Sequence, residues 1–169
     1  LGGSICTRSC AFCQVDKGKP DPNLDKLEAE KVANAVFELK LKYVVITSVA
    51  RDDLPDHGAS LFTNTIKEIR KVIPSIGIEV LTPDFWGGSK DYDIGVQLQK
   101  SRVEKILNLE PACFNHNLET VERLQKEVRR GATYKRSLGL LKVAREINPQ
   151  IPTKSGLMLG LGESKKEII

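Results

Sequence analysis

The chain has 169 residues, of which 40% are hydrophobic and 28% charged, and its formal net charge is +4. This composition is typical of a globular domain, and the length is sufficient for one domain with a hydrophobic core. The small charge, without a basic run interleaved with aromatic residues, argues against a nucleic-acid partner. No apolar stretch approaches the roughly 20 residues of a membrane span, so no membrane partner is expected either.

The apolar pattern predicts strands and helices in alternation along the chain. A continuous apolar run such as "YVVIT" is typical of a strand buried on both faces, and apolar residues three or four apart are typical of a helix. In chain order, we expect a strand tail at 1–5, a helix opened by a capping box at Asp25 and Glu28, a strand at 43–47, a helix over 62–73, a strand at 76–82, a helix over 94–107, a strand at 112–116, helices over 118–128 and 138–147, a strand at 151–159 and a helix opened by a capping box at Ser164 and Glu167.

This order implies an α/β fold with about five parallel strands and helical crossovers. A barrel and an open doubly wound sheet both fit the pattern. In either, the loops that follow the strands share one rim, where functional residues concentrate. Because the chain starts at Leu1 and stops inside its last helix, we expect it to be part of a longer protein.

Three of the four cysteines lie close together, at Cys6, Cys10 and Cys13. A structural zinc site needs four ligands, and no fourth ligand follows nearby. A cubane iron–sulfur cluster can use three thiolates and leave one iron open, so the spacing favours a cluster, with zinc or coincidence as alternatives. Clustered thiols also indicate a reducing, cytoplasmic compartment. Cys113 lies in an apolar strand and is expected in the core.

The spacing of these cysteines resembles the signature of radical S-adenosylmethionine (SAM) enzymes. In that superfamily an aromatic residue commonly precedes the third cysteine, as Phe12 does here, so the resemblance implies that Phe12 contacts the cofactor. Near the other end, "GLMLGLGE" resembles the glycine motif of the same enzymes, with Gly156, Met158, Gly160 and Glu163 at the matching positions. Two such signatures about 140 residues apart are more specific than either alone.

The stretches between the two signatures narrow the resemblance. "ICTRSCAFCQVDKG", "TSVARDD", "TPDFWGG" and "NHNLETV" together resemble the lipoyl synthase family, in wording closest to its cyanobacterial type. The resemblance implies a sulfurtransferase that inserts two sulfur atoms at carbons 6 and 8 of a protein-bound octanoyl group. It implies that residues 1–169 form the radical SAM core domain, a partial (β/α) TIM-like barrel, with the auxiliary-cluster regions outside it.

The same resemblance implies the cofactors and partners. A 4Fe-4S cluster would be held by the three clustered cysteines and would bind SAM, whose reductive cleavage yields a 5′-deoxyadenosyl radical. A second, auxiliary 4Fe-4S cluster is expected only in the full-length protein, so the chain alone should be inactive. The expected partners are octanoylated lipoyl-carrier domains or H protein, and an electron donor such as ferredoxin or flavodoxin. No catalytic side chain is expected beyond the cluster ligands.

The rim loops supply the expected SAM contacts. Thr47 and Ser48 stand where many superfamily members carry Gly-Gly-Glu, so their hydroxyls are expected to hold the amino group of SAM. Asn115 and Glu119 offer an amide and a carboxylate for ribose hydroxyls, whereas Asn117 fits either a ligand contact or a helix cap. Gly156 and Gly160 permit close approach to a flat adenine, with Met158 along its face.

Other polar residues of the rim have plainer interpretations. Arg51, Asp52 and Asp53 are expected to form a solvated charged turn, Asp84 and Trp86 to serve local structure, His116 to be structural or functional with equal weight, and Lys154 to meet a carboxylate. Two other functions remain open at this stage. One is a different radical SAM enzyme, similar to biotin synthase, and the other is a non-catalytic cysteine-rich metal-binding module for an acidic protein.

Overall fold

The computed structural model describes residues 1–86 and 89–169, so the two glycines that end the "TPDFWGG" stretch lie outside the described residues. Its main sheet has four parallel strands in the order β3-β4-β5-β6, each hydrogen-bonded to the next along the chain. These strands are β3 (Tyr43–Thr47), β4 (Gly77–Leu81), β5 (Cys113–Asn115) and β6 (Thr153–Lys154). The predicted parallel sheet with sequential strands is therefore confirmed.

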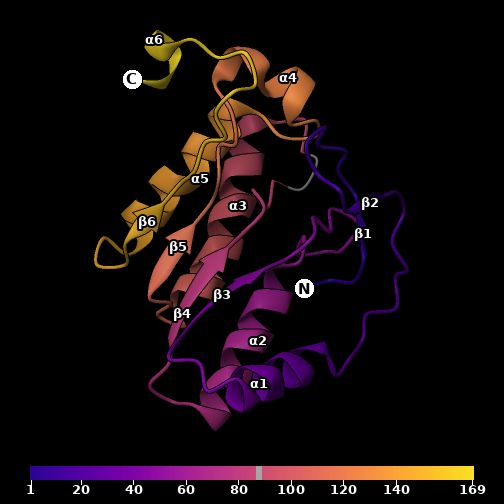
Figure 1. Cartoon of the computed structure of the whole chain (residues 1–169), viewed down its shortest axis with the longest axis vertical. Helices are drawn as coiled ribbons and strands as arrows, with labels where there is room; N and C mark the ends of the chain where they lie inside the picture. The colour runs from indigo at the N-terminus through magenta and orange to yellow at the C-terminus, as the bar shows by residue number, and fades with distance from the viewer. Residues whose placement is uncertain (87–88) are drawn as a thin grey trace.

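Four longer helices connect the strands: α1 (Glu28–Glu38), α2 (Ala59–Val72), α3 (Tyr92–Leu107) and α5 (Tyr134–Ile147). They lie on one side of the sheet, and each contacts its neighbour in the order α1, α2, α3, α5 (Figure 1). Short turns of helix complete the chain: η1 (Glu122–Leu124), α4 (Gln125–Val128) and α6 (Lys165–Ile168). Across the described residues the sheet does not close, so the architecture is that of a partial barrel. No described helix has the length and apolarity that crossing a membrane requires.

The hydrophobic core lies between the sheet and these helices. Ile46, Val80 and Phe114 point from neighbouring strands toward the helices and pack with apolar residues of α2 and α3, such as Phe62 and Ile106. Residues between them, such as Glu79, point to the opposite face because strand side chains alternate. The helix layer thus fixes the strands and presents their carboxyl ends at one rim.

The first strand differs from the prediction. The Leu1 amino group donates to the Thr47 carbonyl at 2.7 Å, and the Val49 N–H donates to the Leu1 carbonyl at 3.1 Å, so the chain start lies beside the end of β3. The strand that follows, β1 (Ile5–Cys6), pairs instead with β2 (Asp16–Lys17) in a separate two-stranded sheet. The strand expected at the start of the chain therefore does not join the main sheet. Instead, β1 forms a local pair with β2 and contains the first cysteine.

Three helix predictions need correction. The Glu28 carboxylate accepts from the Gly2 N–H at 2.9 Å and does not complete a capping box. No helix covers 118–121, because the Leu118 and Glu119 N–H groups donate to the Gly156 carbonyl at 3.1 and 3.0 Å, and this pairing with 156–158 excludes helical bonds. In α5, Leu138 is 44% exposed and Leu140 is buried, so the helix is rotated relative to the apolar stripe that the spacing predicts, namely Leu138, Leu141, Ala144 and Ile147. The capping box that opens α6 is present as predicted.

Candidate functional site

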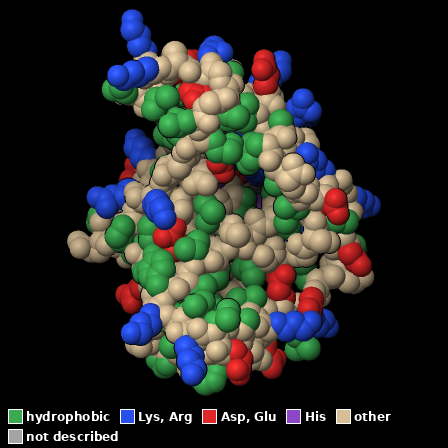
Figure 2. Space-filling view, viewed as in Figure 1, with side chains coloured by type: hydrophobic (Ala, Val, Ile, Leu, Met, Phe, Trp, Pro, Cys, Tyr) green, Lys and Arg blue, Asp and Glu red, His purple; other side chains and the backbone are tan. Residues whose placement is uncertain are grey.

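A cavity of about 410 Å³ lies at the carboxyl ends of β3 and β4, bounded by the cysteine loop. Its lining includes Cys6, Cys10, Cys13, Phe12, Thr47, Ser48, Asn117, Glu119 and Arg129. The three cysteines are all free thiols. Figure 2 shows that charged side chains lie mostly around the periphery of the viewed face, with hydrophobic and uncharged surface in its middle. The structure thus brings all three predicted ligands, and four of the eight predicted SAM contacts, to one cavity.

Backbone contacts hold the cysteine loop against the neighbouring loops. The Thr7 N–H donates to the Ala50 carbonyl at 3.0 Å, and the Ala11 N–H donates to the Val128 carbonyl at 2.8 Å. The Cys6 sulfur accepts the Ala50 N–H at 3.3 Å. The loop is therefore attached to the segment after β3 on one side and to the end of α4 on the other.

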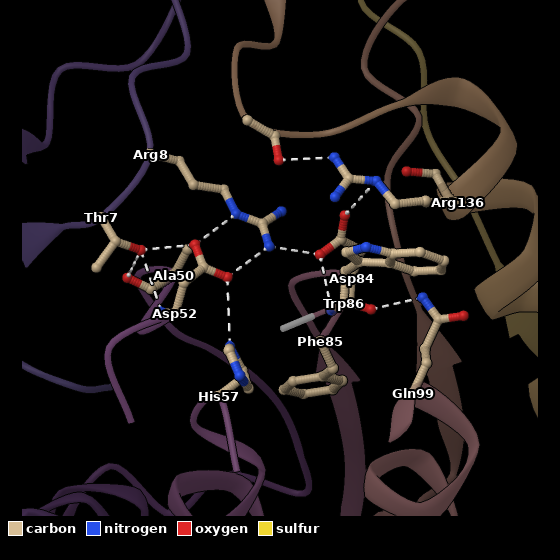
Figure 3. A network of polar contacts seen from close by, with 12 residues as sticks. Thr7, Arg8, Ala50, Asp52, His57, Asp84, Phe85, Trp86, Gln99 and Arg136 are labelled. Atoms are coloured by element: carbon tan, nitrogen blue, oxygen red, sulfur yellow. Dashed lines mark hydrogen bonds and ion pairs between the residues drawn. The ribbon is translucent and has the colours of Figure 1, made fainter. Parts of the chain in front are cut away.

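An ion-pair network supports the same loop (Figure 3). The Arg8 guanidinium donates to both carboxylate oxygens of Asp52, at 2.9 and 2.8 Å, and to Asp84 Oδ1 at 2.5 Å. Burial alone would raise the pKa of the Asp84 carboxyl, but the Arg8 guanidinium outweighs it and holds that pKa below its usual range. The pKa of Asp52 is lowered in the same way.

This network overturns the expectation of a solvated charged turn after β3. Asp52 binds Arg8, and Arg51 is only 2% exposed, with its guanidinium donating to the Gly2 carbonyl at 2.8 Å and to Asp53. Asp84 is fully buried and structural, as expected. A charge-rich loop is usually solvated, and nothing local in the sequence distinguished this turn, whose partners Arg8 and Gly2 lie 44 and 49 residues away.

The two predicted hydroxyls differ in their availability. Thr47 Oγ1 donates to the Leu81 carbonyl at 2.9 Å, so its proton is already used in the sheet. Ser48 Oγ is buried beside the cavity and has no hydrogen-bond partner among the described side chains and backbone. A buried hydroxyl without a partner costs free energy, so Ser48 is the better placed of the two to meet a polar ligand group.

Glu119 and Asn117 line the cavity, and residues of the glycine motif contact both of them. Glu119 has φ 67°, and its carbonyl accepts the Met158 N–H at 2.8 Å. A Cβ atom at Gly156 would lie 3.0 Å from the Asn117 amide oxygen, so glycine permits this approach. The cap role considered for Asn117 is wrong because no helix starts at Leu118.

The predicted contacts at Gly156, Met158 and Gly160 do not line the cavity, and neither does Asn115. The Asn115 amide donates to Glu79 Oε1 at 2.7 Å, and that carboxylate also accepts from Lys154 Nζ at 3.0 Å and Tyr43 Oη at 3.0 Å. These four residues form a polar cluster on the sheet face that points away from the helices. Lys154 thus meets a carboxylate, as expected. The sequence predicts that Asn115 contacts the ribose, but its amide is bonded to Glu79.

One cavity residue escaped the sequence reasoning. Arg129 lines the cavity and is only 8% exposed. Its guanidinium donates to Ser137 Oγ at 2.7 Å and to His116 Nε2 at 3.2 Å. Within residues 1–86 and 89–169, no carboxylate lies within 4.0 Å of its guanidinium. Asp84 and Glu119 act on this charge without contacting it, and a buried cation with no contacting carboxylate favours an anionic ligand group. In the sequence it stands in a charge-rich stretch, "EVRRGATYKR", that looks like a solvated surface.

His116 is structural. The Thr82 carbonyl lies 2.7 Å from Nδ1 and can only accept, so Nδ1 carries the proton and Nε2 accepts from Arg129 and Ser137. Complete burial lowers the pKa of His116 to about 4, and the Arg129 guanidinium acts in the same direction. The imidazole therefore stays neutral and orients Arg129 toward the cavity.

The three thiols fit an iron–sulfur cluster. A cubane binds each thiolate through its own iron, so its ligands need to surround one space rather than meet at one point. Cys6, Cys10 and Cys13 do surround the cavity, although among the described residues no three His, Cys, Asp or Glu side chains converge as ligands of a single ion would. Burial raises the pKa of the Cys10 thiol, and Arg129 opposes that shift.

Comparison with known proteins defines the class. The sequence matches the radical SAM superfamily over residues 2–169. The chain therefore belongs to the radical SAM superfamily, whose members use SAM with a 4Fe-4S cluster. Its fold is similar to that of methylornithine synthase, with a TM-score of 0.69 at 13% identity over 98% of this chain and 45% of that one. It is also similar to a cobalamin-dependent radical SAM enzyme, with a TM-score of 0.61 at 13% identity over 98% of this chain and 24% of that one.

Curated relatives narrow the class further. The chain is 67% identical to "Lipoyl synthase 2" of Prochlorococcus marinus subsp. pastoris over 99% of its length and 56% of the relative's. It is 56% identical to "Lipoyl synthase 2" of Thermosynechococcus vestitus over 100% of its length and 57% of the relative's. It is 52% identical to "Lipoyl synthase" of Glaesserella parasuis over 99% of its length and 49% of the relative's. The chain thus spans about half the length of the curated relatives it matches.

Proposed function

We propose that the chain is the SAM-binding core of a lipoyl synthase, a sulfurtransferase that inserts two sulfur atoms into a protein-bound octanoyl group. The observation that carries this proposal is the identity of 67% to a lipoyl synthase over 99% of the chain. The cavity supports it, because the three cysteines of the superfamily signature line one space together with polar groups suited to an amino acid and a ribose.

In this proposal Cys6, Cys10 and Cys13 hold a 4Fe-4S cluster and leave one iron open to SAM. When bound, the cluster and SAM supply a 5′-deoxyadenosyl radical that abstracts hydrogen from the octanoyl chain. The protein must position the reactants and exclude competing groups from the radical. Phe12, which lines the cavity beside the third cysteine, contributes an apolar wall to this site.

The remaining cavity residues divide the polar groups of SAM between them. Ser48 Oγ, buried without a partner, accepts a hydrogen bond from the SAM amino group. The Arg129 guanidinium, buried with no carboxylate in direct contact, pairs with the SAM carboxylate. Glu119 and Asn117 accept from and donate to the ribose hydroxyls. Thr47 Oγ1 donates its proton to the Leu81 carbonyl, so this hydroxyl stabilises the sheet and does not donate to SAM.

The rest of the reaction involves groups outside these residues. We infer that a second, auxiliary 4Fe-4S cluster supplies the sulfur in a polypeptide as long as the relatives. The substrates are octanoylated lipoyl-carrier domains or H protein, and an electron donor such as ferredoxin or flavodoxin reduces the SAM-binding cluster. The four free thiols fit a reducing, cytoplasmic compartment.

Product analysis tests the function. A polypeptide of the relatives' full length should convert an octanoylated carrier peptide to the lipoyl peptide while releasing 5′-deoxyadenosine, as measured by mass spectrometry. Formation of 5′-deoxyadenosine without sulfur incorporation would refute the lipoyl synthase assignment and leave the superfamily intact.

A substitution tests the assignment of Arg129. Arg129→Gln removes the buried cation, so SAM should bind about tenfold or more weakly, the loss expected for one charge-assisted hydrogen bond. Titration of SAM into the reconstituted protein, followed by the change in the cluster's electron paramagnetic resonance (EPR) signal, measures this affinity. Arg130→Gln, which removes an exposed cation one position later, is the control and should leave it unchanged.

A further inference from the structure

Arg8 stands between two of the proposed cluster ligands, yet its charge is used elsewhere. Its side chain is 9% exposed and makes a bidentate pair with Asp52 as well as a pair with Asp84. The first carboxylate follows β3 and the second follows β4. One side chain of the cysteine loop is therefore bonded to the loops of two neighbouring strands (Figure 3).

Both carboxylates are themselves held in place. Thr7 Oγ1 donates to Asp52 Oδ2 at 2.7 Å, which fixes that carboxylate from the cysteine loop. The Asp84 carbonyl accepts from Gln99 Nε2 at 2.6 Å, so α3 holds the backbone of this aspartate. The Trp86 N–H donates to Asp84 Oδ1 at 3.2 Å. Asp84 is therefore not free to follow Arg8 if the cysteine loop moves, whereas Asp52 is bonded to Thr7 of the same loop.

The residue after Asp84 shows how strongly this loop is determined. Phe85 has φ 49°, a left-handed conformation that is unfavourable for a residue with a bulky side chain. Its ring is fully buried and packs edge-on against Phe62, with the ring centroids 5.9 Å apart, and its carbonyl accepts from Arg102 at 2.7 Å. These contacts hold the strained backbone, and with it the position of the Asp84 carboxylate.

The aliphatic part of Arg8 is confined from the opposite side. A Cβ atom at Gly131 would lie 3.2 Å from Arg8 Cγ, and Gly131 has φ 92°. The side chain therefore runs between the segment after α4 and the two carboxylates. Its stem and its charged end are both fixed, so the backbone of the cysteine loop has little freedom at this position.

We propose that Arg8 is a positioning residue that fixes the three-cysteine loop against β3 and β4 before the cluster binds. This inference rests on the proposed role of Cys6, Cys10 and Cys13 as cluster ligands and adds how they are arranged. A guanidinium can reach both carboxylates at once because its donors form a rigid planar fork, whereas a lysine ammonium cannot reproduce that geometry. The charge stays the same in Arg8→Lys, but the position of the loop does not.

Thiol alkylation in the cluster-free protein tests the proposal. In Arg8→Lys, Cys6, Cys10 and Cys13 should be alkylated about tenfold faster than in the parent, as expected for the loss of one charge-assisted hydrogen bond, with rates read residue by residue by mass spectrometry. Cys113 is buried in β5 and reports on global unfolding, so its rate of alkylation should stay unchanged if only the cysteine loop is loosened. Arg123→Lys is the matched control, since Arg123 makes an exposed bidentate pair with Glu167 away from this loop.

Two outcomes would overturn the proposal: unchanged rates at the three loop cysteines, or a parallel rise at Cys113, which would mean general destabilisation. If Arg8→Lys does not fold, Thr7→Val provides a milder variant, because it removes only the hydroxyl that fixes Asp52. In Thr7→Val the three loop cysteines should again be alkylated faster and Cys113 at the parental rate, with a several-fold smaller increase than in Arg8→Lys. Because no SAM, cluster or substrate is present, the result is independent of whether sulfur insertion is observed.

Cluster retention supplies the second measurement. After anaerobic reconstitution, Arg8→Lys and Asp84→Asn should each lose iron to a chelator about tenfold faster than the parent, and the double variant should lose it no faster than the singles, because both disrupt one interaction. Additive losses in the double variant would show that the two residues act separately and would contradict the proposal. Arg123→Lys should lose iron at the parental rate.

Discussion

Two buried carboxylate clusters lie on this fold, and they are built differently. Glu79 on the sheet face is bound by residues of adjacent strands, whose register already places Asn115 beside Lys154. Asp84 at the rim is bound by Arg8 from a loop 76 residues away in sequence. The sheet-face cluster therefore depends on the sheet, whereas the position of the cysteine loop depends on the rim cluster. The structure predicts that disturbing the first affects stability alone, and that disturbing the second affects both stability and the site.

The largest effect is expected at the rim. Asp84→Asn removes a fully buried carboxylate and leaves Arg8 with one of its two partners, so the free energy of unfolding should fall by about 3 kcal/mol. Urea unfolding of the cluster-free protein at pH 7 measures the change. A loss below about 1 kcal/mol would show that the Arg8–Asp84 pair is not a principal support of the rim.

The pH dependence of stability distinguishes the buried histidine beside Arg129 from the sheet-face carboxylate. The pKa of His116 is about 4 in the folded chain and about 6.5 unfolded, so only the unfolded chain binds a proton between these values. Stability should therefore fall by on the order of 3 kcal/mol as pH drops from 6.5 to 4. The pKa of Glu79 is lowered, because its hydrogen bonds outweigh the effect of burial, so its contribution is lost only below about pH 4.3.

Urea unfolding at several pH values tests this contrast. The slope of stability against pH between 4 and 6.5 should disappear in His116→Gln and persist in Glu79→Gln. A slope that survives in His116→Gln would mean that another group titrates in this range, and the neutral histidine beside Arg129 would need to be reconsidered.

The smallest effect is expected on the sheet face. Glu79→Gln keeps an acceptor for Asn115 and loses the ion pair with Lys154, whose side chain is 57% exposed, so the free energy of unfolding should fall by about 1 kcal/mol. Iron content after reconstitution should equal that of the parent. Loss of iron in this variant would contradict the division between a structural sheet face and a functional rim.

Elements with strong local signals were predictable from the sequence. The strand at 43–47 has its predicted bounds, and α3 extends the predicted helix by two residues at its start. The three cysteines line the cavity although β1 lies outside the main sheet. Ser48 and Glu119 share it as expected, because they follow β3 and β5 and the carboxyl ends of parallel strands meet at one rim. In these cases a short stretch of sequence determines the structure, or the topology alone brings the residues together.

Apart from the orientation of α5 and the role of Arg129, the misses involve partners distant in sequence. The apolar spacing of 118–128 favours a helix, but two N–H groups of this segment bind Gly156 and hold Glu119 in a left-handed conformation. Arg8 and Asp52 look like solvated charges until the fold brings them together. Local pattern cannot show such pairings, and they decide how the cavity is lined.

The most direct test of the account is the iron content of cysteine variants in a polypeptide of the relatives' full length. Cys10→Ser should lose, after anaerobic reconstitution, the EPR signal that shifts on SAM addition, together with release of 5′-deoxyadenosine. Cys113→Ser, at a buried cysteine on the sheet face, should retain both. If Cys10→Ser kept the full iron content of the parent and released the nucleoside at the parental rate, the cavity between β3 and β4 would not be the cluster site.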